Sequence, residues 1–152
     1  MSGGFFYFVF RYFVVRIIIH YSQFITRHMS LIQDFESYRT KMNDRIMETA
    51  NTNIKRFFAL DTTTYADGAL DVKTKEMLGL VASMVLRCDD CISYHIAQCK
   101  EAGVNREEFF EVFSVGLVVG GSIVIPHLRR GVDFLDTLEA GEGDAAACAD
   151  HA

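Results

Sequence analysis

Residues 87–95 read Arg-Cys-Asp-Asp-Cys-Ile-Ser-Tyr-His and place two cysteines, Cys88 and Cys91, where a helix is expected to begin. Two thiols at this spacing can close a local disulfide, and the free N–H groups and dipole of a helix N-terminus stabilise a thiolate. The preceding arginine adds to this effect, whereas Asp89 and Asp90 oppose it through like charge. We expect at least one of these carboxylates to cap the helix. The sequence therefore predicts a redox-active cysteine pair.

His95 lies four positions after Cys91, so both side chains share one face of the helix. The imidazole can take a proton from a thiol, or return one to a leaving oxygen, directly or through a water. Cys99 extends the same stripe by one turn. For Cys99 we favour a small buried hydrophobe over a third redox partner.

Other uses of the cysteine pair make different demands. Thioredoxin-like chemistry needs a strand before the pair, and no strand pattern is found after Met29. Haem attachment needs a His directly after the second cysteine, where Ile92 stands. Zinc accepts thiolates and imidazole, but a structural site needs a fourth donor. Zinc binding and a purely structural pair stay as alternatives, and we expect no metal and no cofactor.

Outward from this stretch, apolar side chains recur at steps of three and four, the pattern of amphipathic helices. One long helix is expected over residues 31–58, followed by a change of direction over residues 61–68. Asp71 is expected to cap a second helix. The third helix begins near Cys88 and ends at Gly103, which suits a left-handed C-terminal residue.

The C-terminal part supplies two further helices. Asn105 is expected to cap the fourth, whose residues 112–119 are almost continuously apolar and should therefore be central. The fifth begins near Ile123 and tolerates Pro126 only in its first turn. No segment after Met29 alternates with a period of two, so the fold class is all-α, a compact bundle of five to six helices.

The chain has 152 residues, 50% of them hydrophobic and 23% charged, which suits one domain with a core. We assign that domain to residues 29–140 and expect a loose tail over residues 141–152. A formal charge of −5 disfavours a nucleic-acid partner, because phosphate binding needs a basic face. Four cysteines are too few for a small secreted disulfide scaffold, so we expect a reducing, cytoplasmic compartment.

Residues 1–28 differ in composition from the rest and contain three arginines and no acid. Most of residues 5–25 are Phe, Tyr, Val or Ile, but Arg11, Arg16 and His20 interrupt the run. Apolar residues worth about −0.3 to −0.6 kcal/mol each are set against about +2.5 to +3.5 kcal/mol per central Arg, so membrane insertion is near balance. We weigh membrane or partner contact through residues 5–25 against a non-native extension upstream of an internal start, and give the extension more weight.

Glu76 precedes Cys88 by eleven intervening residues, and Cys91 and His95 follow at the spacings given above. This complete Glu-Cys-Cys-His pattern resembles the redox members of the alkylhydroperoxidase D-like branch of the carboxymuconolactone decarboxylase family. The likeness extends over about residues 70–138. It implies the all-α, alkylhydroperoxidase D-like fold for this part of the chain.

The resemblance implies a thiol-dependent peroxidase of peroxiredoxin type, or a disulfide reductase, with an antioxidant role. In such a protein the cysteine pair reduces a hydroperoxide substrate and becomes a disulfide that a dithiol electron donor reopens. Glu76 and His95 would form the proton relay, with Cys91 the thiol nearer to it and Cys88 the more accessible one. The decarboxylase members lack the thiol pair, so lactone decarboxylation is disfavoured.

The relay sets a geometrical condition. An uninterrupted helix would place Glu76 about 18 Å from Cys88. The chain must therefore reverse near Cys88, with the next helix packed antiparallel so that His95 returns toward Glu76. His127, Tyr94 and Arg87 are further pocket candidates, although for His127 a partly buried capping role is favoured.

We also expect a homo-oligomer, because the apolar side chains of the last two helices exceed what one small bundle can cover. The trimers and hexamers of the resembled family point the same way. The alternative function is a redox-switched helical oligomer or partner-binding module without peroxidase turnover.

Overall fold

The computed structural model describes residues 15–17, 19 and 32–149, with residues 142–149 described by their backbone alone. The helices are residues 32–49, α2 (Thr52–Tyr65), α3 (Val72–Leu86), α4 (Asp89–Glu101), α5 (Arg106–Gly120), the 3₁₀ helix η1 (Ser122–Val124) and α6 (Ile125–Ala149). The predicted all-α bundle is confirmed. Most of the predicted N-terminal extension, and with it the prediction of membrane contact, lies outside the described residues. Within the described part, none of the helices has the length and hydropathy that a membrane span requires.

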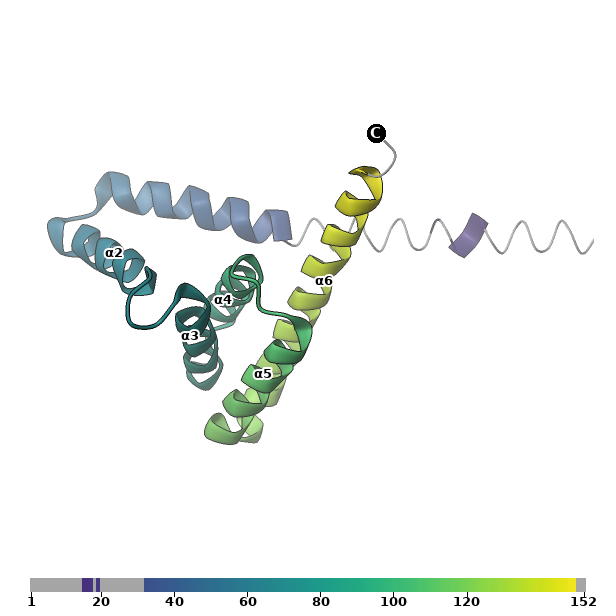
Figure 1. The fold of residues 1–152 in the computed structure, drawn as a ribbon. Coiled ribbons are helices and arrows are strands. Elements are labelled where there is room, and N and C mark those ends of the chain that lie inside the picture. Colours follow the sequence, from purple (N-terminus) through teal and green to yellow (C-terminus); the bar gives the residue numbers. More distant parts are fainter. Residues whose placement is uncertain (1–14, 18, 20–31, 150–152) are drawn as a thin grey trace, which may run out of the picture.

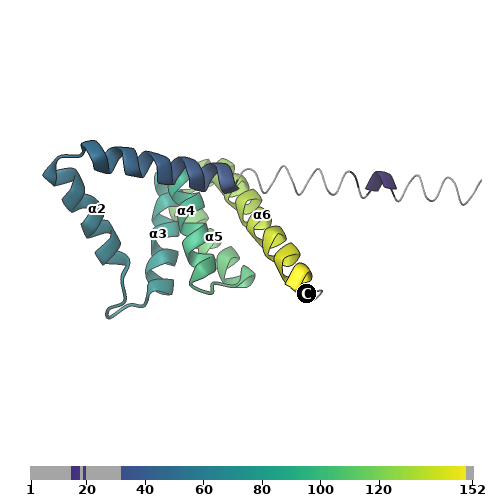
Figure 2. The same cartoon turned by 90° about the horizontal axis from the view of Figure 1, so that it is seen from above.

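The body of the molecule is formed by α3 to α6. α3 packs against both α4 and α5, and α6 packs against α4 (Figure 1). The helix over residues 32–49 lies across this body, as the view from above shows (Figure 2). It contacts α6 through an edge-to-face pair of Phe35 and Phe134, whose ring centroids are 5.6 Å apart.

The core lies between these four helices and comes from every one of them. Its buried apolar side chains are Leu80, Met84, Ile92, Ile96, Cys99, Val104, Phe109, Val112, Phe113, Val124 and Leu135. The members on α3, α4 and α5 recur at the steps of three and four predicted from the sequence. Burial of this stripe, rather than local propensity, supplies most of the stability of such helices.

The caps predicted at Asp71, Asn105 and Gly103 are confirmed. The Asp71 side chain accepts a hydrogen bond from Thr74 N at 2.8 Å. Asn105 and Glu108 form a reciprocal capping box at the start of α5. Gly103 takes a φ of 79°, a left-handed conformation that glycine adopts without a steric penalty. Pro126 is the second residue of α6. In the first turn of a helix the backbone N–H groups have no acceptor within the helix, so the missing N–H of proline costs no hydrogen bond there.

The single long helix predicted over residues 31–58 is wrong. The chain breaks after residue 49, and Asn51 starts α2 by accepting hydrogen bonds from the backbone N–H groups of Asn53 and Ile54. The turn predicted from Asp61 begins five residues later, because α2 continues to Tyr65. Asparagine prefers caps to helix interiors, so the capping preference overrode the apolar period.

Two further predictions about the C-terminal helices need correction. The backbone of residues 141–149 continues α6 instead of forming a loose tail, which fits the high helix propensity of its alanines. On α5, Phe113 and Gly116 are buried but Val115, Val118 and Val119 are 51%, 86% and 64% exposed. In the single chain, residues 112–119 are therefore central on one side only.

Candidate thiol and histidine site

The chain reverses between α3 and α4, as the proton relay requires. Arg87 caps α3 in the left-handed conformation, with φ 60° and ψ 40°. Its N–H donates to Met84 O at 3.1 Å, and the N–H of Cys88 donates to Ser83 O at 3.1 Å. α4 thus runs back along α3, and Arg87 itself is exposed at the turn.

Cys88 and Cys91 are joined by a disulfide at the start of α4, with their Cα atoms 5.2 Å apart. Cys88 is the N-cap residue, and its Sγ accepts a hydrogen bond from Cys91 N at 3.3 Å. The prediction that Asp89 or Asp90 caps α4 is wrong, because the sulfur takes that position and both carboxylates fall in the first turn. The cap hydrogen bond points a backbone N–H at the sulfur, as stabilisation of a thiolate would require.

Glu76 and His95 are brought together from the middle of α3 and of α4. His95 Nδ1 lies 2.7 Å from Glu76 Oε2, and the two side chains are only 10% and 3% exposed. A carboxylate on Nδ1 orients the ring and leaves Nε2 as the atom that exchanges a proton. The required antiparallel return of His95 toward Glu76 is thus present in the structure.

Gly79 makes room for the His95 ring. A Cβ at this position would lie 2.5 Å from His95 Cε1 and 2.7 Å from Tyr65 Oη. Tyr65 is the last residue of α2, and its ring centroid is 5.3 Å from that of His95. Burial, and then the negative charge of Glu76, raise the pKa of the Tyr65 phenol above its ordinary value, so Tyr65 is a neutral hydroxyl beside the pair.

Tyr94 covers another side of His95, at 5.2 Å between centroids. The guanidinium of Arg39, from the helix over residues 32–49, lies 3.7 Å over the Tyr94 ring. Burial and the charge of Glu76 raise the pKa of Tyr94, against the opposing effect of Arg39. Tyr94 was a predicted pocket candidate, whereas Tyr65 and Arg39 were missed because no local spacing links either one to the cysteine pair.

Cys99 is fully buried in the core. Burial, and then the charge of Glu76, raise the pKa of its thiol to about 12, so it carries a proton at neutral pH. The prediction of a small buried hydrophobe is confirmed.

His127 lies in the first turn of α6 and contacts α4 rather than the cysteines. Its Nδ1 is 2.8 Å from Asp89 Oδ1, and Arg130 Nε is 3.0 Å from Asp89 Oδ2. Partial burial raises the pKa of Asp89, but the hydrogen bonds from Arg130 and His127 outweigh it and hold that pKa below its ordinary value. His127 is partly buried, as expected, and the contacts of its ring are with the side chains of Asp89 and Arg130.

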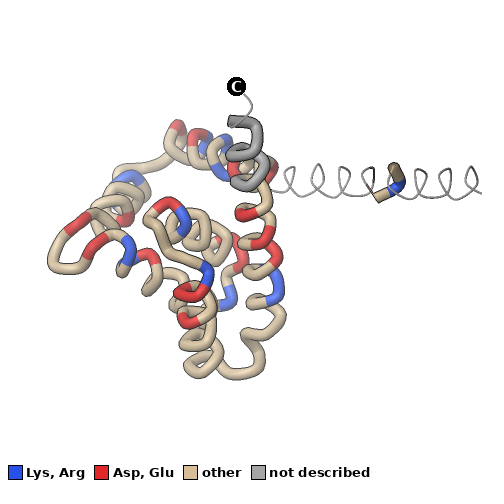
Figure 3. The backbone as a smooth tube through the Cα atoms, turned by 45° about the vertical axis from the view of Figure 1, so that its right-hand side comes forward, with Lys and Arg blue, Asp and Glu red and all other residues tan. Residues whose placement is uncertain are grey.

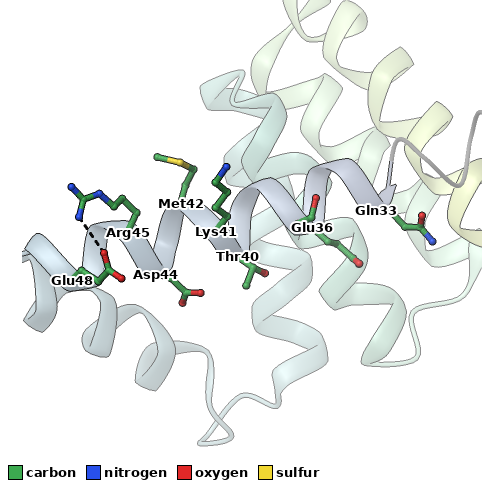
Figure 4. A pocket seen from close by; sticks show the side chains of 9 residues that line it. Gln33, Glu36, Thr40, Lys41, Met42, Asp44, Arg45 and Glu48 are labelled. Atoms are coloured by element: carbon green, nitrogen blue, oxygen red, sulfur yellow. Dashed lines mark hydrogen bonds and ion pairs between the residues drawn. The ribbon is translucent and has the colours of Figure 1, made fainter.

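The described residues contain no group of three or more His, Cys, Asp and Glu side chains placed to hold a metal ion. A hollow of about 930 Å³ is lined by residues between 33 and 48, all on the helix over residues 32–49 (Figure 4). Its side chains are mostly polar, with Arg45 and Glu48 paired at 3.1 Å, and none belongs to the site. This open groove on one helix is unsuited to bring a substrate to the cysteines.

The family model of the carboxymuconolactone decarboxylase family matches residues 53–133, which run from α2 into α6 and include the cysteines, Glu76 and His95. The chain belongs to the carboxymuconolactone decarboxylase family. A Thermotoga maritima protein of this family is 53% identical, and its crystal structure matches with a TM-score of 0.73 over 74% of this chain and 98% of that chain. A second crystal structure of the Thermotoga protein, with a TM-score of 0.71, ascribes to it a possible role in antioxidative response.

Two more distant relatives are also similar to this chain. A carboxymuconolactone decarboxylase family protein of Legionella pneumophila is 24% identical, with a TM-score of 0.60 over 71% of this chain and 94% of that chain, which shows the fold alone. An uncharacterised protein of the cox locus of Paracoccus denitrificans is 28% identical over 83 residues, 55% of this chain and 75% of its own length.

Proposed function

We propose that this chain is a thiol-dependent peroxidase in which Cys88 and Cys91 reduce a hydroperoxide and His95, oriented by Glu76, moves the protons. Two features together carry the proposal. A disulfide lies at the N-terminus of α4, and a buried carboxylate–imidazole pair joins Glu76 of α3 to His95 of α4. The antioxidative role suggested for the Thermotoga relative supports the same class of chemistry.

The reaction balances within these groups and two named reactants. In the reduced protein a thiolate attacks the peroxide, an S–O bond forms and the O–O bond breaks. The alkoxide leaves as an alcohol after taking a proton from His95, and the cysteine becomes a sulfenic acid. The second thiol then attacks that sulfur and releases water, so the two thiols are oxidised to the disulfide. A dithiol donor reopens the disulfide by exchange and is itself oxidised to a disulfide.

The structure supports a division of labour between the two cysteines. Cys88 Sγ accepts the Cys91 N–H, an interaction that favours negative charge on Cys88. Cys91 precedes His95 by one helical turn, on the face that carries the proton relay. Glu76 holds Nδ1 of His95, so protons pass through Nε2.

Intact-mass thiol counting tests the proposed function. The chain is fully reduced, freed of reductant and treated with hydrogen peroxide, and its remaining thiols are counted. We expect the untreated chain to have two more free thiols than the treated one. The Cys91→Ser variant should form no internal disulfide and should lose turnover with a dithiol donor. Cys99→Ala is the matched control and keeps turnover, because that thiol is buried and protonated. Turnover retained by Cys91→Ser would overturn the proposal.

We further propose that a second copy of this chain covers the apolar face of α3 and α5, called here the α3/α5 face. Its exposed members are Leu78 on α3, Val115, Val118 and Val119 on α5, and the adjoining Ile123 on η1. A hollow of about 380 Å³ lies beside them, between α3 and α5. The lower end of the bundle in Figure 3 carries few charged residues, and residues 112–124 contain none, whereas Glu108 and Glu111 line the hollow. An apolar patch of this kind on a soluble domain marks an interface.

A further inference from the structure

We propose that Arg130 is a positioning residue for the redox pair: by binding Asp89, it cancels the negative charge that the first turn of α4 places beside Cys88. The inference rests on the proposed thiol chemistry. It concerns the stability of the thiolate, so it can be tested without peroxide turnover.

The first step is the position of Asp89. It follows Cys88 directly and is the first residue of α4. A carboxylate there interacts well with the helix dipole, but it competes with a neighbouring thiolate for the same positive end. Asp90 stands next to it and is exposed. Two adjacent carboxylates would therefore raise the free energy of the Cys88 anion.

The second step is the contact from α6. Arg130 Nε donates to Asp89 Oδ2 at 3.0 Å, while His127 Nδ1 lies 2.8 Å from Oδ1. Arg130 Nη2 is also 3.0 Å from His127 Nδ1. One Nδ1 atom cannot donate to Asp89 and accept from Arg130 at once. We therefore assign a proton to Nδ1 of His127, which donates it in a hydrogen bond to Asp89. Arg130 then supplies the positive charge and His127 the second hydrogen bond.

The third step is the charge balance around Cys88. Among the described residues, Arg87 precedes Cys88 at the turn, Asp89 and Asp90 follow it on α4, and Arg130 and His127 of α6 contact Asp89. On the α3 side, Glu76 is paired with His95 further along α4. Two arginines thus balance two carboxylates, and loss of Arg130 leaves a net negative charge next to the sulfur.

The consequence is a thiolate that depends on a helix distant in sequence. Asp89 stays ionised at neutral pH because its pKa is held low by Arg130 and His127 after partial burial has raised it. Its charge must therefore be cancelled rather than removed by protonation. Arg130 is a suitable partner because a guanidinium keeps its charge over the whole physiological range.

Opposite shifts in two single variants test the inference. In the reduced full-length chain, the thiolate is titrated by its ultraviolet absorbance. Arg130→Gln is expected to raise the pKa of the reactive thiol by about 0.5 to 1 pH unit, and Asp89→Asn to lower it by a similar amount, given the partial exposure of the pair. The double variant should return close to the parent value.

Matched controls separate charge from simple loss of a helix contact. Arg130→Lys keeps the charge and should keep most of the effect. Arg129→Gln removes a neighbouring exposed cation and should leave the titration unchanged. If Arg130→Gln and Asp89→Asn shift the pKa in the same direction, or if neither shifts it, the inference is overturned. Circular dichroism confirms that each variant is folded.

The outcomes also distinguish this inference from the proposed function. Opposite pKa shifts in a chain that reduces no peroxide would support the charge balance and overturn the peroxidase. Peroxide turnover with no opposite shifts would do the reverse.

Discussion

Gly79 determines how much space His95 has beside Glu76. Both ring atoms of His95 that face it, and the Tyr65 hydroxyl, lie within 2.8 Å of the place a Cβ would occupy. A larger residue must therefore displace either the imidazole or the Tyr65 hydroxyl. The glycine is needed for this close approach of α2, α3 and α4 rather than for its backbone conformation.

Gly79→Ala is expected to slow peroxide-dependent disulfide formation by about 100-fold, because a small displacement of the acid–base group disrupts proton transfer. The free energy of unfolding should fall by about 1–3 kcal/mol through overpacking. Stopped-flow thiol loss and urea denaturation measure the two effects. Gly141→Ala, where a Cβ meets nothing within 4 Å, is the control and leaves the rate unchanged. An unaltered rate in Gly79→Ala would show that the His95 position is not needed.

Cys99 makes the free energy of unfolding depend on pH. Its thiol has a pKa of about 12 when folded, against an ordinary value of 9.0. Between these values the unfolded chain has lost the proton and the folded chain keeps it, so stability falls as pH rises. Below pH 9 the thiol is protonated in both states, so the contribution of Cys99 to the free energy of unfolding is constant.

Replacement by an apolar residue should remove this dependence. With the Cys88–Cys91 disulfide kept closed, urea denaturation of the parent chain is expected to show a steeper loss of stability above pH 9 than that of Cys99→Val. The difference between the two chains isolates Cys99 from the other groups that titrate at high pH. Parallel curves would contradict the buried, protonated thiol.

At the scale of single elements, α5 is a helix with two different apolar sides. Phe109 and Phe113 fill the core, whereas Val118 is 86% exposed in the single chain. Residues 112–119 carry apolar side chains on both sides of α5, a pattern typical of a helix segment that is buried on both sides. We propose that a second copy of the chain covers the α3/α5 face, which would bury these exposed valines.

Val118→Glu is expected to shift the chain from an oligomer to a monomer, because a carboxylate buried in an apolar interface loses its hydration without a partner. Light scattering across a range of protein concentrations measures the mass. Phe57→Glu places the same charge at an exposed apolar position on α2, and should leave the oligomer intact. A parent chain that is monomeric at every concentration would exclude the interface.

At the scale of the whole molecule, the site is assembled from helices that are distant in sequence. α3 and α4 supply the relay and the disulfide, α2 adds Tyr65 beside His95, and α6 binds Asp89 at the start of α4. The helix over residues 32–49 adds Arg39 above Tyr94. The arrangement couples the proposed thiol chemistry to the packing of the bundle, so we expect substitutions in α2 or α6 to change the reactivity of the cysteines.

The amino-acid sequence alone determined the all-α class, the caps at Asp71 and Asn105, and the spacing that makes Cys88, Cys91 and His95 neighbours on one helix. These features depend on backbone hydrogen bonds and on a period of 3.6 residues, which act over a few positions and can be read locally. The same local rules failed at Asn51, where two of them conflicted.

Only the tertiary structure decided that Cys88 caps α4, that Tyr65 and Gly79 enclose His95, and that Arg130 binds Asp89. The Glu76–His95 contact is intermediate. The family resemblance implied the relay, the relay required a chain reversal, and the left-handed Arg87 provides that reversal. Contacts between side chains of different helices depend on how whole apolar faces pack. That packing is driven by the burial of apolar area over the entire chain, and no short stretch of sequence contains it.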